Sequence, residues 1–145
     1  MDKYDSLKLE SQLCFPLYAA SRQIIKRYRP YLDALDLTYT QYIAMMVFWE
    51  EREISVKELG HRLYLDSGTL TPVLKSLEAK GYITRCRCPE DERMVIAKLT
   101  DRGEALRDEA LPVPEQMAGC VTLPDGETLQ LYLLLRKLLQ VLDEE

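Results

Sequence analysis

The sequence lacks several features on which common classes of protein depend. It has no apolar run long enough to span a membrane, and it does not begin with the basic start and apolar core of an export signal. It has one histidine, His61, and shows neither a glycine-rich phosphate loop nor a Ser-His-Asp set. We therefore expect a cytoplasmic protein with reduced thiols, no catalytic residues, no cofactor and no metal.

Composition and charge limit the class of partner. A chain of 145 residues that is 47% apolar can form one domain with a hydrophobic core. The net charge of −5 is concentrated in residues 100–145, which carry four basic and ten acidic side chains. Residues 66–99 carry six basic and five acidic side chains. This balance permits binding to nucleic acid in the middle of the chain but does not require it.

Residues 55–81 have the pattern of a helix, a turn and a second helix. Ser55 and Glu58 can form a capping box at the start of the first helix. Asp66 is a candidate N-cap for the second helix, and Gly81 is well placed to end it. The apolar residues of the second helix recur at helical spacing: Leu70, Val73, Leu74 and Leu77. Its other side chains are then expected to face outward, Ser76 among them.

Pro72 leaves the start of the second helix open. If Asp66 is the cap, Pro72 lies inside the helix, where it removes a hydrogen bond. If Thr71 is the cap, Pro72 takes the favoured first position of a shorter helix. The residues alone do not decide between these starts.

A β-hairpin follows the two helices. Residues 83–88 and 93–99 read as strands joined by an acidic turn, Pro89-Glu90-Asp91-Glu92. Two helices followed by such a hairpin are the arrangement of a winged helix-turn-helix, whose second helix enters the major groove of double-stranded DNA. The predicted fold class is mainly α with a small β-wing.

Further helices flank this part of the chain. We expect one over residues 13–35 that Pro30 bends or interrupts, one opened by a capping box at Thr38 and Gln41, and one capped by Thr100 that ends near Pro112 or Gly119. The last helix, residues 129–142, is apolar nearly all round. Such a helix needs a cover, which a second copy of the chain would supply in a homodimer; the alternative is burial within one chain.

Two stretches resemble a known family. The whole layout looks like the MarR family of bacterial regulators. Residues 63–72, LYLDSGTLTP, resemble the recognition helix of its OhrR branch, the organic-hydroperoxide-sensing repressors, and residues 9–18, LESQLCFPLY, resemble the segment with that branch's reactive cysteine. The resemblance implies one domain over residues 1–145, with dimerisation helices in about 1–37 and 112–145 and a DNA-binding lobe in about 38–111. It also favours a helix that starts near Asp66.

The resemblance also implies a DNA-binding surface on the second helix and the hairpin. In the hairpin, Asp91 and Arg93 match the family's Asp-x-Arg motif, in which the aspartate orients an arginine that enters the minor groove. A solvated turn is the alternative. The candidate DNA-binding residues are Asp66, Ser67, Gly68, Thr69, Thr71, Lys75, Arg85, Asp91 and Arg93.

Cys14 is the candidate redox-sensing residue. Its place near the start of a helix favours an anion, and only a thiolate attacks a peroxide bond quickly. Tyr18, Tyr28 and Tyr39 match the tyrosines that surround the sensing cysteine in the branch, some of them from the partner subunit. Their O–H groups would stabilise the thiolate. The alternatives are an inert core thiol and ordinary interface packing of the tyrosines.

The other three cysteines suggest different roles. Cys120 is the candidate resolving cysteine, which would form a disulfide with Cys14 of the partner subunit; a small cellular thiol is the alternative partner. Cys86 and Cys88 on the hairpin could meet one metal together with His61, but three ligands at this spacing make a thin case. We expect these two thiols to pack under the hairpin.

Three functions compete at this point. The first is a repressor that leaves DNA when an organic hydroperoxide oxidises Cys14. The second keeps the DNA-binding lobe but makes a small aromatic or phenolic ligand the inducer. The third is a thiol peroxidase that uses Cys14, against which stands the absence of any other catalytic set.

Overall fold

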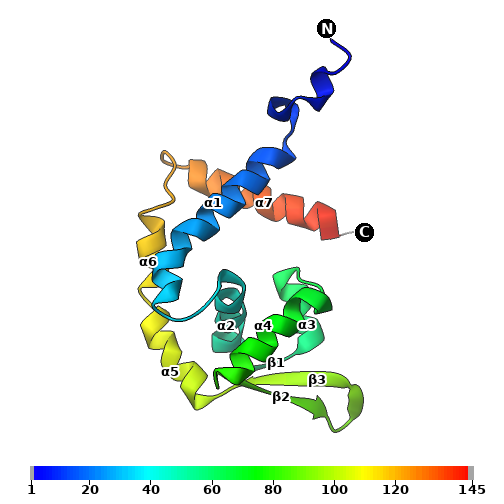
Figure 1. Ribbon diagram of the computed structural model, residues 1–145, viewed down its shortest axis with the longest axis vertical. Helices are drawn as coiled ribbons and strands as arrows, with labels where there is room; N and C mark the ends of the chain where they lie inside the picture. Colours follow the sequence, from blue (N-terminus) through cyan, green and yellow to red (C-terminus); the bar gives the residue numbers. More distant parts are fainter. Residues whose placement is uncertain (1, 144–145) are drawn as a thin grey trace. The chain divides into compact units, whose positions relative to one another are not determined.

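A computed structural model describes residues 2–143, which form two compact units (Figure 1). The first unit extends to Val113 and the second begins at Pro114. Among the described residues, no helix combines the length and the apolar character needed to cross a membrane. Each unit is described by itself below.

The first unit contains a helical lobe and a three-stranded antiparallel sheet of order β1-β3-β2. Its elements in chain order are the short 3₁₀ helices η1 (Asp5–Leu7) and η2 (Leu9–Ser11), α1 (Cys14–Asp33), α2 (Tyr39–Glu51), β1 (Glu53–Ser55), α3 (Val56–Leu63), α4 (Ser67–Ala79), β2 (Ile83–Cys88), β3 (Asp91–Leu99) and α5 (Asp101–Ala110). The expected winged helix-turn-helix is thus present, with α3 and α4 as its helices and β2 and β3 as its wing. Strand β1, which pairs with β3 through Ser55 and Ile96, was not predicted, because three residues next to a helix cap give no strand pattern.

Side-chain caps begin the helices where the sequence predicts them. At α2, Thr38 Oγ1 accepts from the Gln41 backbone N–H, and Gln41 Oε1 accepts from the Thr38 backbone N–H. This capping box is therefore complete. Ser55 caps α3 by accepting from the Glu58 N–H at 3.1 Å, and the described hydrogen bonds of Ser55 and Glu58 include no return bond. Each such cap typically contributes about 1 kcal/mol to helix stability.

Helix α4 begins at the earlier of the two candidate starts. Asp66 is its N-cap and accepts from the Thr69 N–H at 2.7 Å, so Pro72 lies inside the helix. Near the proline, Thr71 Oγ1 donates to the Ser67 carbonyl at 2.7 Å. The helix ends before Gly81, whose φ of +82° is the left-handed conformation that the C-terminal stop requires.

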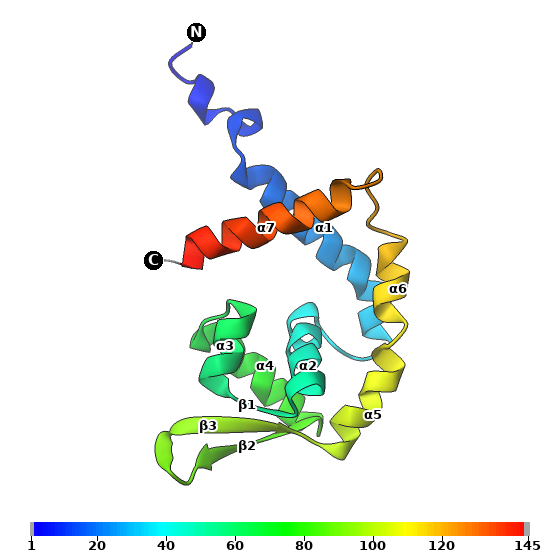
Figure 2. The same ribbon diagram turned by 180° about the vertical axis from the view of Figure 1, so that it is seen from behind.

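Helix α2 is the centre of the first unit. It contacts α1, α3, α4 and α5, and in the view from behind it lies among them above the sheet (Figure 2). The largest fully buried side chains are Phe48 and Met45 of α2, together with Leu59, Leu70, Leu74, Leu77 and Ile83. The Trp49 indole N–H donates to the Gly103 carbonyl at 2.9 Å, which ties α2 to α5.

Ser76 differs from the expectation that it faces outward. Its side chain is half-buried between α4 and α2, where Ser76 Oγ accepts from Gln41 Nε2 at 2.9 Å. Helical spacing alone could not place it, because Ser76 borders the apolar stripe and the partner that holds it is 35 residues away in the sequence.

The helix α6 (Val113–Ala118) begins at the last residue of the first unit, and the rest of it lies in the second unit with α7 (Glu127–Asp143). The helix capped by Thr100 ends at Ala110 and is followed by α6 as a separate helix, so the predicted end near Pro112 was close and the one near Gly119 was wrong. In α7 no described side chain is buried, although leucines fill much of its length. The cover of this helix, by a second copy or within one chain, and the domain boundaries stay predictions.

A substitution at Gly103 tests how α5 packs against the rest of the first unit. A Cβ atom at this position would lie 2.2 Å from the Tyr82 carbonyl oxygen and 2.7 Å from Leu99 Cδ1. Because the Tyr82 carbonyl is backbone, relief requires a shift of α5, and we expect Gly103→Ala to lower the free energy of unfolding by roughly 1–3 kcal/mol or more.

Gly68→Ala is the matched control for Gly103→Ala. Its new Cβ would meet only Asp66 Oδ1, at 3.6 Å, so chemical denaturation should show no loss of stability. Equal unfolding midpoints for the two variants would contradict the close approach of α5 and Tyr82.

Candidate nucleic-acid interface and redox site

Helix α4 presents a small polar surface at its N-terminal end. Ser67, Gly68, Thr69 and Lys75 are exposed, as predicted for residues that contact DNA. The Thr69 backbone N–H, which donates to Asp66, holds the pKa of that carboxyl below its usual range. Thr71 is half-buried, and its hydroxyl is used within the helix. Apart from Lys75, the exposed side chains are short, which suits close approach to base edges and phosphates.

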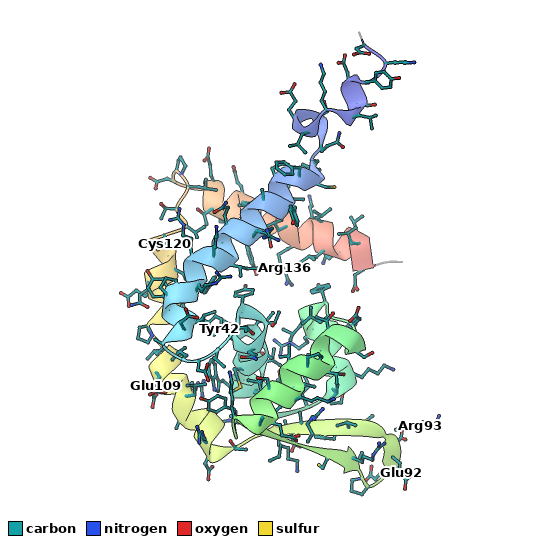
Figure 3. The ribbon with its side chains drawn as sticks, viewed as in Figure 1. Tyr42, Glu92, Arg93, Glu109, Cys120 and Arg136 are labelled. Atoms are coloured by element: carbon teal, nitrogen blue, oxygen red, sulfur yellow. The ribbon has the colours of Figure 1, made fainter. Side chains whose placement is uncertain are left out.

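The wing ends in an ordered acidic and basic turn. Asp91 Oδ1 accepts from the Arg93 backbone N–H at 3.0 Å and lies 3.8 Å from Arg93 Nε. The Arg87 guanidinium donates to the Glu92 carbonyl at 2.8 Å across the hairpin. Arg93 itself projects from the tip with 96% of its side chain exposed (Figure 3). Asp91 thus bonds the Arg93 backbone, and the entry of the Arg93 guanidinium into a minor groove stays a prediction.

Arg85 has a partner within the protein. Glu78 near the end of α4 accepts from the Arg85 backbone N–H at 3.0 Å and from Arg85 Nη2 at 3.2 Å. The hydrogen bond from the Arg85 side chain holds the pKa of Glu78 below its usual range. This pair fixes the base of the wing to the recognition helix, and a direct contact of Arg85 with DNA stays a prediction.

Cys14 is the first residue of α1, and it is exposed. It therefore does not lie in the core of the first unit, and its reactivity stays a prediction. Leu13 and Phe15 beside it are exposed as well. A hollow of about 600 Å³ adjoins this segment, and its lining residues are Lys8, Leu9, Glu10, Gln12, Phe15 and Pro16. Cys14 itself is not among the residues that line this hollow.

Tyr28 and Tyr39 form a cluster with a third tyrosine, Tyr42 (Figure 3 labels Tyr42 on α2). The ring centroids are 4.9 Å apart for Tyr28 and Tyr39, 5.8 Å for Tyr28 and Tyr42, and 6.4 Å for Tyr39 and Tyr42. Burial raises the pKa of all three phenols, so they remain protonated donors at neutral pH. Tyr42 was not predicted; its position three residues after Tyr39, on the same helix face, was the available signal.

The tyrosine cluster and Cys14 of the same chain lie far apart along α1. Fourteen helical residues separate Cys14 from Tyr28, which corresponds to ~21 Å at the rise of an α-helix. Tyr18 is different, because it follows Cys14 by one helical turn, and its hydroxyl accepts from Arg22 Nη1 at 3.2 Å. The structure therefore brings Tyr28 and Tyr39 together but not with their own Cys14.

The remaining cysteines lie on the wing and after α6. Cys86 is exposed on β2, so the expectation that it packs under the hairpin was wrong, because its side of the strand faces solvent. Cys88 is half-buried on the same strand, and His61 is exposed on α3. Within residues 2–143, no three His, Cys, Asp or Glu side chains are grouped so that they could hold a metal ion. Cys120 is exposed in the turn after α6.

Known proteins are similar to the chain over nearly its full length. The family model of the transcriptional regulator SarA/Rot matches residues 23–110. The organic hydroperoxide resistance transcriptional regulator of Bacillus subtilis is 48% identical over 144 residues, which cover 96% of this chain and 97% of that protein.

Solved structures agree with this result. Reduced AbfR bound to DNA has a TM-score of 0.80 at 33% identity, with 99% of this chain and 98% of that chain covered; AbfR is a protein of Staphylococcus epidermidis. Its disulfide form has a TM-score of 0.67 at 35% identity, with coverage of 97% and 96%. A MarR mutant of E. coli with operator DNA has a TM-score of 0.77 at 26% identity, with coverage of 96% and 99%. The chain therefore belongs to the MarR and SarA family of winged-helix transcriptional regulators, in the branch of the organic hydroperoxide resistance regulators.

Proposed function

We propose that the protein is a homodimeric repressor that binds double-stranded operator DNA and releases it when an organic hydroperoxide oxidises Cys14. The observation that carries this proposal is the exposed thiol at the N-terminus of α1 in a chain whose wing and recognition helix remain open to solvent. A regulator of this kind acts on chromosomal DNA, so we place it in the cytoplasm.

The DNA-binding role is assigned to α4 and the wing. Ser67, Thr69 and Lys75 of α4 would contact base edges and phosphates in the major groove. Arg93 would enter the adjacent minor groove, where the negative potential favours a guanidinium. The bond from the Arg93 N–H to Asp91 supports this role, because it orders the tip before DNA is bound.

A dimer would supply a cover for α7 and a second recognition helix. The apolar side chains of α7 that are exposed in the chain would be covered by a second copy, and two α4 helices would read half-sites about one helical turn apart. The distance along α1 supports the same arrangement, since Tyr28 and Tyr39 could donate to Cys14 only across a subunit boundary. Tyr18 would donate within its own chain.

The sensing reaction is a two-electron oxidation of the thiol. The Cys14 thiolate attacks one peroxide oxygen, the O–O bond breaks, and the alkoxide leaves and takes up a proton to become the alcohol, with a sulfenic acid on Cys14. The thiol of Cys120 from the partner subunit then displaces water and forms a disulfide; a small cellular thiol is the other candidate. The disulfide form of AbfR supports a step of this kind. The reaction stops after one equivalent, so the protein is a sensor rather than an enzyme.

Arg93→Ala tests the wing. The variant should weaken operator binding by about 1–3 kcal/mol if the guanidinium reads the groove. Arg107→Ala on α5 is the control, because Arg107 is also an exposed cation but pairs with Glu104 away from the wing. Fluorescence anisotropy with labelled operator DNA measures both, and an unchanged affinity for Arg93→Ala would refute the groove contact.

Cys14→Ser tests the switch. Reduced wild-type protein should bind its upstream DNA tightly and lose at least about tenfold in affinity after one equivalent of an organic hydroperoxide, whereas Cys14→Ser should bind and stay bound. Cys86→Ser is the control, since it removes another exposed thiol. A non-reducing gel of wild type and Cys120→Ser identifies the disulfide.

Other outcomes of this experiment separate the competing functions. Release of Cys14→Ser by an aromatic acid but not by peroxide would make a small ligand the inducer. Continued consumption of hydroperoxide with a thiol reductant would make the protein a peroxidase. Either result overturns the proposed switch.

Tyr28→Phe and Tyr39→Phe test the role of the phenols. Each variant keeps the ring and removes one donor to a charged group, so Cys14 should oxidise about ten- to a hundredfold more slowly while the reduced protein keeps its DNA affinity. Tyr82→Phe, whose ring stacks with Arg102, is the control. An equal loss of DNA affinity and sensing rate would mean that the tyrosines are structural.

A further inference from the structure

Gln41 stands out because it is buried and polar. Its side chain is 8% exposed and is the one polar side chain in the buried core of the described residues. It lies two residues after Tyr39, in the first turn of α2. The sensing reaction proposed above gives it no role.

The amide of Gln41 joins two segments that are distant in sequence. Gln41 Oε1 accepts from the Thr38 backbone N–H at 3.1 Å, in the turn that leads from α1 to α2. Gln41 Nε2 donates to Ser76 Oγ on the recognition helix α4 at 2.9 Å. One planar amide thus fixes the backbone next to Tyr39 at a set distance from α4.

Lys80 makes a second link between the same two segments. Its ammonium follows α4 and donates to the Gln41 Oε1 atom at 3.2 Å and to the carbonyl of Asp36 in the turn. Asp36 has a φ of +54°, so this turn holds a left-handed conformation that a non-glycine residue seldom adopts. The turn and α4 are therefore bonded into one group of residues, and Tyr39 follows the bonded Thr38 directly in the sequence.

A displacement of the backbone at Tyr39 would also change the hydrogen bonds between the turn and α4. If the turn moves while α4 stays, the buried amide of Gln41 loses a partner that water does not replace. The turn and α4 are thus favoured to move together. The tyrosine cluster next to the turn contacts α1 through Tyr28, which gives events at the redox site a route to the recognition helix.

We propose that Gln41 is the positioning residue through which the tyrosine site acts on the recognition helix. It touches neither the thiol nor DNA, and it sets the position of α4 according to the state of the turn at Tyr39. This proposal rests on the proposed function, because it requires that oxidation of Cys14 be read at the tyrosines.

Ser76→Ala tests the link with little change elsewhere. It removes the acceptor on α4 and leaves the capping box of α2 in place. The oxidation rate of Cys14 should remain that of the wild type, while the ratio of operator affinities before and after oxidation should fall at least fivefold. Ser76→Thr keeps the hydroxyl and should restore most of the ratio.

Glu78→Gln is the matched control. It weakens another link of α4, the one to Arg85 at the base of the wing, and should lower operator affinity by the same factor in both redox states. The ratio then stays at the wild-type value. Thermal unfolding of each variant checks that the comparison is made on folded protein.

The possible results separate the two proposals. A wild-type protein that releases DNA on oxidation and a Ser76→Ala variant that releases it by the same factor would overturn the role of Gln41 alone. A wild-type protein that does not respond to the hydroperoxide would overturn the redox switch, and the role of Gln41 with it. If Glu78→Gln lowered the ratio of operator affinities by as much as Ser76→Ala, this would also count against the role of Gln41. Any loosening of α4 would then be enough to lower the ratio.

Discussion

Helix α2 packs against four neighbouring helices, so each buried polar group that it carries needs a partner inside the protein. The Trp49 indole finds the Gly103 carbonyl, and the Gln41 amide finds Thr38 and Ser76. A buried polar group without a partner costs about 1–3 kcal/mol, which is a large part of the stability of a small domain. These bonds therefore decide where α4 and α5 can lie, and the DNA-facing surfaces follow from them.

The same constraint places the tyrosine cluster close to the recognition helix. Tyr39 and Tyr42 lie on the first turns of α2. Helix α4 packs against α2, and Ser76 of α4 bonds to Gln41, which lies between the two tyrosines in the sequence. Burial keeps the phenols protonated, because it raises their pKa values, so they are suited to donate hydrogen bonds to an anion. In an allosteric regulator, the coupling free energy between the effector site and the DNA-binding site is typically only a few kcal/mol. Neighbouring residues on one buried helix can supply a coupling of that size.

Local signals in the sequence located most of the fold. Asp66, Thr38 and Thr100 cap their helices as predicted, and Gly81 ends α4, because each of these effects depends on residues within one turn. The bonds of Ser76 and the Tyr42 contact join distant segments, and no local pattern specifies them. Strand β1 was missed for the same reason, since its three residues form a strand only because β3 lies beside them. The resemblance to a family supplied the candidate site residues, but not the residues that hold them in place.

The distribution of charge limits how many basic side chains of the DNA-binding lobe are available to bind phosphate. Of the basic side chains in residues 66–99, Lys80, Arg85 and Lys98 pair with Asp36, Glu78 and Glu53 in the protein. Few cations are left for phosphate, and each phosphate neutralised adds to affinity through the release of counterions. One copy would then bind weakly, whereas two joined copies combine their contacts on one operator. In the proposed dimer a small displacement of one α4 against the other is therefore enough for release, because neither copy holds DNA well alone.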